Sequence, residues 1–82
     1  MGSNRTLAFV QKFEILRIKE DSHPLDGSRI FLVQIAVDGV PCMPFWTHVA
    51  ERRAKGEEAW LEGLKENAVD MVARFGRQPA LA

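Results

Sequence analysis

Apolar side chains dominate an unbroken stretch in the first half of the chain, residues 30–37. β-Branched and aromatic residues prevail in this stretch, which favours a strand over a helix. The dipeptide Asp38-Gly39 follows at once, and it is the preferred pair for a two-residue turn between antiparallel strands. The pattern therefore predicts a β-hairpin whose first strand is 30–37.

A turn at Asp38-Gly39 also fixes the register of the strand that follows it. In this register Phe31 lies opposite Trp46. Pro41 and Pro44 have no N–H group and cannot donate to a neighbouring strand. The strand after the turn is therefore predicted to lie at the edge of the sheet, or to fray early, which leaves 30–37 in the middle.

A second strand pattern precedes the hairpin, over residues 6–19. Its apolar side chains change from one face to the other near Glu14, which indicates a β-bulge or a strong local twist. The segment 21–28 contains Pro24 and Gly27 among small polar residues, a composition typical of a loop.

The second half of the chain has helical periodicity. Apolar side chains recur at helical spacing over residues 57–75, which predicts an amphipathic helix that Gly76 ends. A shorter helix is predicted over 48–55, with Thr47 as its N-cap. Gly56 separates the two helical segments.

These elements predict an α+β fold, a three-stranded antiparallel β-meander followed by a C-terminal amphipathic α-helix packed on one sheet face (β-β-β-α). Because 82 residues suffice for one domain and not for two, we expect a single domain over 1–82. Its ordered core is expected at about 6–76, with frayed ends at 1–5 and 77–82. The predicted core residues are Phe9, Phe13, Phe31, Val33, Ile35, Trp46, Leu61, Leu64, Ala68, Val72 and Phe75.

Both faces of the predicted hairpin are apolar, whereas one helix covers only one face of a sheet. The face away from the helix carries Ile30, Leu32, Met43 and Phe45. Three explanations remain open: another segment of the chain covers this face, a second copy covers it, or a different protein does. We expect these four residues to form a protein interface, with a homodimer as the leading form and another protein as a possible partner.

Charge argues against one class of function. Lys and Arg together number eleven, as do Asp and Glu, so the net charge is zero, whereas nucleic-acid binders usually carry a basic excess. The basic cluster of Arg52, Arg53 and Lys55 could contact phosphates, although the acids beside it favour a solvated helix turn. A small nucleic-acid-associated accessory or regulatory protein is therefore the alternative function, and nucleic acid is not the favoured partner.

Reactive residues are few. Cys42 is the only cysteine, so an internal disulfide is excluded, and its place on a predicted strand indicates a buried, inert thiol. His23 and His48 add too few ligands for a metal centre. Because phosphate-binding and nucleophile motifs are also absent, we expect no catalytic residues, no cofactor and no metal.

Cysteine usage and hydropathy bear on the compartment. A secreted domain of this size usually carries several disulfides, so we expect a reducing cytoplasm. Apolar runs are too short for a membrane span, and the first residues lack a signal-peptide pattern, so we expect no membrane association. The sequence thus predicts a small non-enzymatic protein-interaction module that self-associates through an apolar sheet face.

Overall fold

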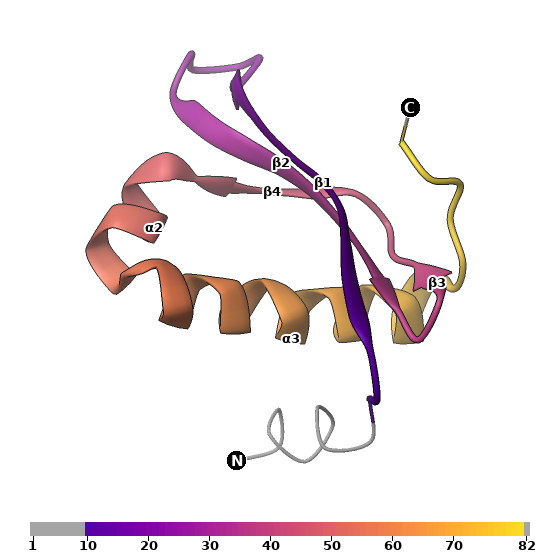
Figure 1. Ribbon diagram of the computed structural model, residues 1–82. Coiled ribbons are helices and arrows are strands. Elements are labelled where there is room, and N and C mark those ends of the chain that lie inside the picture. The colour runs from indigo at the N-terminus through magenta and orange to yellow at the C-terminus, as the bar shows by residue number, and fades with distance from the viewer. Residues whose placement is uncertain (1–9, 82) are drawn as a thin grey trace.

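The computed structural model describes residues 10–81, and they form a sheet with helices on one side (Figure 1). The predicted frayed end at 1–5, the predicted strand start at Thr6 and the predicted core residue Phe9 lie outside the described residues. The α+β class is confirmed, because antiparallel strands are followed by C-terminal helices. The elements are β1 (Phe13–Ser22), β2 (Arg29–Val37), β3 (Val40–Pro41), β4 (Phe45–His48), α2 (Val49–Lys55) and α3 (Glu57–Phe75).

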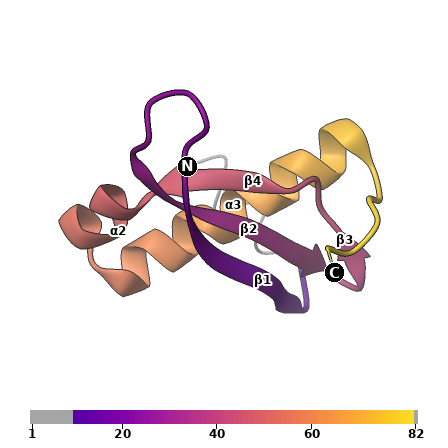
Figure 2. The ribbon, with the colours of Figure 1, turned by 90° about the horizontal axis from the view of Figure 1, so that it is seen from above.

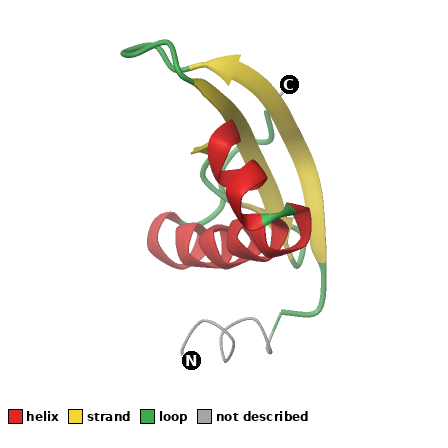
Figure 3. Ribbon diagram, turned by 90° about the vertical axis from the view of Figure 1, so that its left-hand side faces the viewer, coloured by secondary structure: helices red, strands yellow, loops and turns green. Residues whose placement is uncertain are grey.

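β2 is the central strand, as predicted, but the sheet has four strands and not three, because the strand predicted after the turn is divided into β3 and β4. β1 pairs antiparallel along one side of β2, while β3 and β4 both pair antiparallel along its other side. The helices lie on one side of the curved sheet (Figure 3). We call the face that they cover the inner face and the opposite face the outer face.

The irregularity predicted in the first strand is present. The pairing of β1 with β2 shifts between Ile15 and Arg17, so that Leu16 is an extra residue in the ladder. An extra residue of this kind bends the strand and increases its twist. β1 continues past its predicted end at Lys19.

The hairpin turn is also confirmed. Asp38 has a φ of 49° and Gly39 a φ of 81°, and positive φ at both central residues is the requirement of a type I′ turn. Val37 pairs with Val40 across it. The turn also holds the segment before β1, since Asp38 N–H donates to Lys12 C=O and Lys12 N–H donates to Asp38 Oδ1, both at 2.8 Å.

The predicted pairing of Phe31 with Trp46 is wrong, because the strand after the turn is interrupted. β3 ends at Pro41, and regular pairing resumes at Phe45, which lies opposite Val33. The register has slipped by one residue across this interruption, so each later side chain lies on the face opposite to the one predicted. Phe45 is consequently in the core, at 7% exposure, whereas Trp46 is 46% exposed.

α3 closes the inner face with side chains that recur every four residues. Trp60, Leu64 and Ala68 are all buried against the sheet. Of the predicted core residues, Phe75 at the end of α3 is exposed instead, as is Trp46 on β4. The buried core cluster consists of Val33, Ile35, Val37, Cys42, Phe45, Trp60, Leu64 and Ala68, and the predicted core residues Phe13, Phe31, Leu61 and Val72 pack against it.

The helix ends agree with the sequence except at one cap. Gly56 separates α2 from α3, and Gly76 follows α3, as predicted. The N-cap of α2 is His48 and not Thr47. Thr47 has a different role, because its hydroxyl accepts a hydrogen bond from the Trp60 indole Nε1 at 3.1 Å and so fixes the largest side chain of the core.

The C-terminal segment returns to the sheet, although we expected residues 77–82 to fray. Gln78 N–H donates to Pro41 C=O at 3.0 Å, and Leu81 N–H donates to the side chain of Gln34 at 2.8 Å. Figure 2 shows the chain turning back from the end of α3 past β3. We call residues 77–81 the tail.

The slipped register gives a test with a built-in control. Phe45→Ala should lower the free energy of unfolding by about 3–5 kcal/mol, because it removes a buried aromatic ring from the core. Trp46→Ala should cost only about 1 kcal/mol, because that side chain is half exposed. Urea unfolding of the two variants measures both values, and a larger cost at Trp46 than at Phe45 would contradict the register.

Candidate interaction surface

Within residues 10–81, the helices lie on the inner side of the sheet and leave the outer face without a helix (Figure 3). Leu32 on β2 pairs with Trp46 on β4, and Leu32 is partly buried while Trp46 is half exposed. Met43, 39% exposed, lies in the irregular segment between β3 and β4. We call Leu32 and Trp46 the outer patch.

Two of the four residues predicted for an interface, Ile30 and Phe45, are buried in the structure. Ile30 lies on the outer face but is buried, between Asp21 on β1 and His48 on β4. Phe45 faces α3 on the inner face and is not available to a partner. Trp46, which the sequence assigned to the core, takes its place on the outer face.

Two imidazole rings hold the Trp46 indole. The ring centroids of His23 and His48 lie 4.7 and 5.1 Å from that of Trp46, both nearly perpendicular to it. His23 comes from the loop between β1 and β2, and its side chain is largely buried. The half-exposed indole is therefore a positioned aromatic group, the kind of side chain that most often contributes binding energy at interfaces.

Hydrogen bonds within the loop that carries His23 hold this loop in its conformation. Asp26 accepts hydrogen bonds from the backbone N–H of Ser28 at 2.9 Å and from its hydroxyl at 2.7 Å. These bonds, the backbone one first, lower the pKa of the Asp26 carboxyl, so the group stays ionised at neutral pH. Leu25 N–H donates to His23 Nδ1 at 3.1 Å, which orients the ring that contacts Trp46.

Charges of both signs border the outer patch. Lys19 on β1 lies opposite Leu32, and Asp21, two residues along the same strand, lies opposite Ile30. Both residues are exposed. A border that holds a cation and an anion side by side on one strand is able to pair with an inverted copy of itself.

Cys42 is buried, as its position on the strand predicted. It is fully enclosed in the core cluster, and its N–H donates to Ile35 C=O at 2.9 Å. Burial raises the pKa of the thiol, so little of the reactive thiolate is present at neutral pH. The residue therefore packs the core and offers no accessible nucleophile.

Arg52, the first residue of the predicted basic cluster, belongs to the packing around Trp60. Its guanidinium lies over the rings of Phe31 and Trp60, at 5.8 and 5.5 Å from their centroids. It also donates to the Glu57 carboxylate at 2.6 Å. Arg52 thus links the two helices to the edge of the core, a structural role that leaves its charge compensated.

The other two cations of the cluster differ from each other. Lys55 forms an ion pair with Glu51 at 3.3 Å, one helical turn earlier on α2. Arg53 is exposed on the same helix. The structure therefore brings the three residues together on α2, but two of their charges are already compensated by neighbouring carboxylates.

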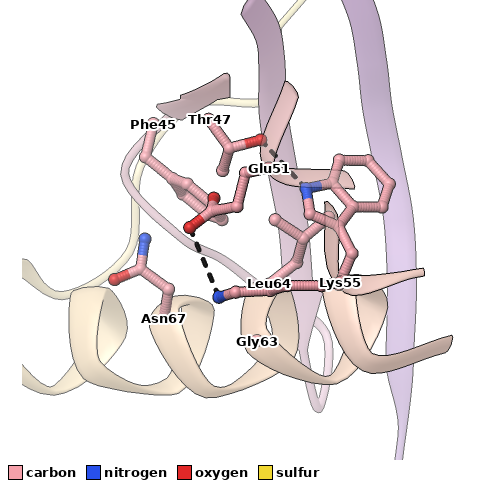
Figure 4. A pocket seen from close by; sticks show the side chains of 8 residues that line it. Phe45, Thr47, Glu51, Lys55, Gly63, Leu64 and Asn67 are labelled. Atoms are coloured by element: carbon pink, nitrogen blue, oxygen red, sulfur yellow. Dashed lines mark hydrogen bonds and ion pairs between the residues drawn. The ribbon is translucent and has the colours of Figure 1, made fainter. Parts of the chain in front are cut away.

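A pocket of about 250 Å³ opens between β4, α2 and α3 (Figure 4). Apolar atoms of Phe45, Leu64 and Trp60 line it together with Thr47, Glu51, Lys55, Gly63 and Asn67. Most of its polar groups bond to one another, Glu51 to Lys55 and Trp60 to Thr47. The lining of the pocket is therefore partly apolar and partly polar, and its groups do not form a nucleophile with an adjacent base.

Within residues 10–81, no three or more His, Cys, Asp or Glu side chains are grouped so that they could hold a metal ion. In the same range, no helix combines the length and the hydropathy needed to cross a membrane. Comparison of the chain with protein-family models, with curated proteins and with solved structures finds no match.

The burial of Cys42 leads to a kinetic prediction. A thiol reagent such as iodoacetamide should modify Cys42 in the native protein at least about a hundredfold more slowly than in urea, because modification requires opening of the core. Mass spectrometry of timed samples measures both rates. Native and unfolded rates that agree within a factor of about two would show an accessible thiol and contradict this placement.

Proposed function

We propose that this chain is a non-enzymatic protein-interaction module that forms a homodimer through the outer patch. The observation that carries the proposal is the half-exposed Trp46 indole, held by two imidazole rings beside Leu32 on an uncovered sheet face. Exposed apolar patches on small domains commonly mark interfaces, and tryptophan is enriched among the residues that dominate binding.

A second copy is the partner that the border of the patch fits best. Lys19 and Asp21 are neighbours on the outer face of β1, so the border of the patch carries one charge of each sign and a second copy offers the same two charges for pairing. The zero net charge removes long-range repulsion between copies. Two-fold dimers that use one self-complementary patch are also the commonest oligomers.

The alternative functions have less support. A different protein could occupy the outer patch, but no feature of the surface formed by residues 10–81 favours it over a second copy. A nucleic-acid-associated role would rely on Arg52, Arg53 and Lys55, of which Arg52 and Lys55 are already paired with carboxylates. We further propose a reducing compartment such as the cytoplasm, since Cys42 is a free thiol.

The homodimer predicts a specific effect of charge in the patch. Leu32→Glu should raise the dimer dissociation constant roughly tenfold or more, because two carboxylates would be brought into the apolar interface. The fold should persist, because Lys19 lies directly opposite and can pair with the new carboxylate. Sedimentation velocity over a concentration series measures the dissociation constant.

Ala59→Glu is the matched control. It adds the same charge at an exposed position in the first turn of α3, where an acidic residue suits the helix dipole. This variant should dimerise like the unmodified chain. A chain that is monomeric at all concentrations, or a Leu32→Glu variant that is folded and dimerises as the control does, would overturn the proposal.

A further inference from the structure

One buried side chain on the outer face, that of Gln34, forms hydrogen bonds with main-chain atoms of the tail. Gln34 Nε2 donates to Pro79 C=O at 2.9 Å, and Gln34 Oε1 accepts from Leu81 N–H at 2.8 Å. Gln34 itself is fully buried, and its Nε2 also donates to Cys42 C=O at 2.8 Å. The amide of Gln34 is thus satisfied by the protein backbone at both ends.

The spacing of these contacts identifies the ligand class. Pro79 and Leu81 are two residues apart, and in an extended chain such residues present their C=O and N–H groups along the same edge. A single side-chain amide therefore binds the tail much as a neighbouring strand would, by main-chain hydrogen bonds. We call Gln34, together with the Pro41 C=O that accepts from Gln78 N–H, the Gln34 site.

We propose that the Gln34 site accepts the tail of a second copy in place of the chain's own tail, so that two copies exchange residues 77–81. The inference rests on the proposed homodimer, which supplies the second copy. Exchange of an identical segment between subunits is a common route to dimers, because the same contacts form within one chain or between two.

Three features of the structure support exchange. The hydrogen bonds named above involve only the main chain of the tail, so a tail from either copy makes them equally well. Gly76, with a φ of 70°, separates the rigid helix α3 from the tail and provides a short hinge. The Gln34 site and the outer patch share the outer face, since Leu32 and Gln34 are two residues apart on β2.

The buried side-chain amide of Gln34 also requires hydrogen-bond partners. If the tail left without a replacement, Gln34 would lose two hydrogen bonds, and an unsatisfied buried amide is costly. A tail from a second copy restores both bonds. The site therefore favours an exchanged arrangement over an empty one whenever a second copy is bound.

Two full-length variants separate the site from its ligand. Leu81→Pro removes the N–H that Gln34 accepts and leaves the site intact, whereas Gln34→Leu removes the amide and leaves the tail intact. In a mixture of ¹⁵N-labelled Gln34→Leu chain with excess unlabelled Leu81→Pro chain, a competent tail meets a competent site only between copies. The Leu81 amide of the labelled chain should exchange with solvent roughly tenfold more slowly in the mixture than alone. An unchanged exchange rate in the mixture would overturn the proposal.

A second experiment uses a synthetic peptide. Its result depends neither on dimerisation nor on whether the Gln34→Leu variant folds. A synthetic peptide with the sequence of residues 77–82 should shift the Gln34 side-chain amide resonances of the Leu81→Pro chain. The same peptide with proline in place of its leucine should not. Absence of binding by the first peptide would show that the site does not take a tail from outside and would overturn exchange. Peptide binding by a chain that stays monomeric in sedimentation would instead identify the homodimer as the part that fails.

Discussion

Pro41 and Pro44 impose the constraint on which the rest of this structure depends. Neither can donate a hydrogen bond to β2, and the segment 42–44 between them leaves the regular ladder. When pairing resumes at β4, the register has slipped by one residue. The slip places Phe45 in the core and Trp46 outside it, so a single interruption shapes both faces of the sheet.

The same slip positions the neighbours of these two residues. Thr47 follows Phe45 to the inner face, where its hydroxyl fixes the indole of Trp60. His48 follows Trp46 to the outer face, where its ring contacts that indole. The hydrogen bond that fixes Trp60 of α3 and the outward position of Trp46 therefore both follow from one backbone irregularity.

The outer face is closed at its ends and open in its middle. The loop that carries His23 closes the end near Ile30, and the tail closes the other end over Gln34. A domain of this size buries a smaller fraction of its surface on folding than a large domain does. The outer patch is the part of the sheet that neither the helices nor these two segments reach.

Local signals in the sequence account for what could be predicted. The turn at Asp38-Gly39, the bulge in β1 and the bounds of α3 each depend on a few adjacent residues, and all three agree with the structure. The prolines indicated an edge strand or early fraying, but they did not indicate that pairing with β2 resumes at Phe45 in a different register. Trp46 was therefore placed on the wrong face, and Phe45 with it.

The candidate site was predicted in part for the same reason. Leu32 lies on the face where the sequence placed it, because β2 precedes the slip. The docking of the tail depends on a contact between residues 45 and 47 positions apart, which no local pattern encodes. Its only sequence signal is Gln34 itself, a polar residue inside an apolar strand that needs hydrogen-bond partners once buried.

The most direct test of the account is an isotope-filtered NOE measurement on a mixture of ¹³C-labelled and unlabelled chains. The account predicts intermolecular NOEs between the Trp46 indole of one copy and the Leu32 methyl groups of the other. Such NOEs require both the slipped register, which turns Trp46 outward, and association through the outer patch. A dimer whose intermolecular NOEs come from the exposed side of α3, around Phe75, and not from Trp46 would contradict it.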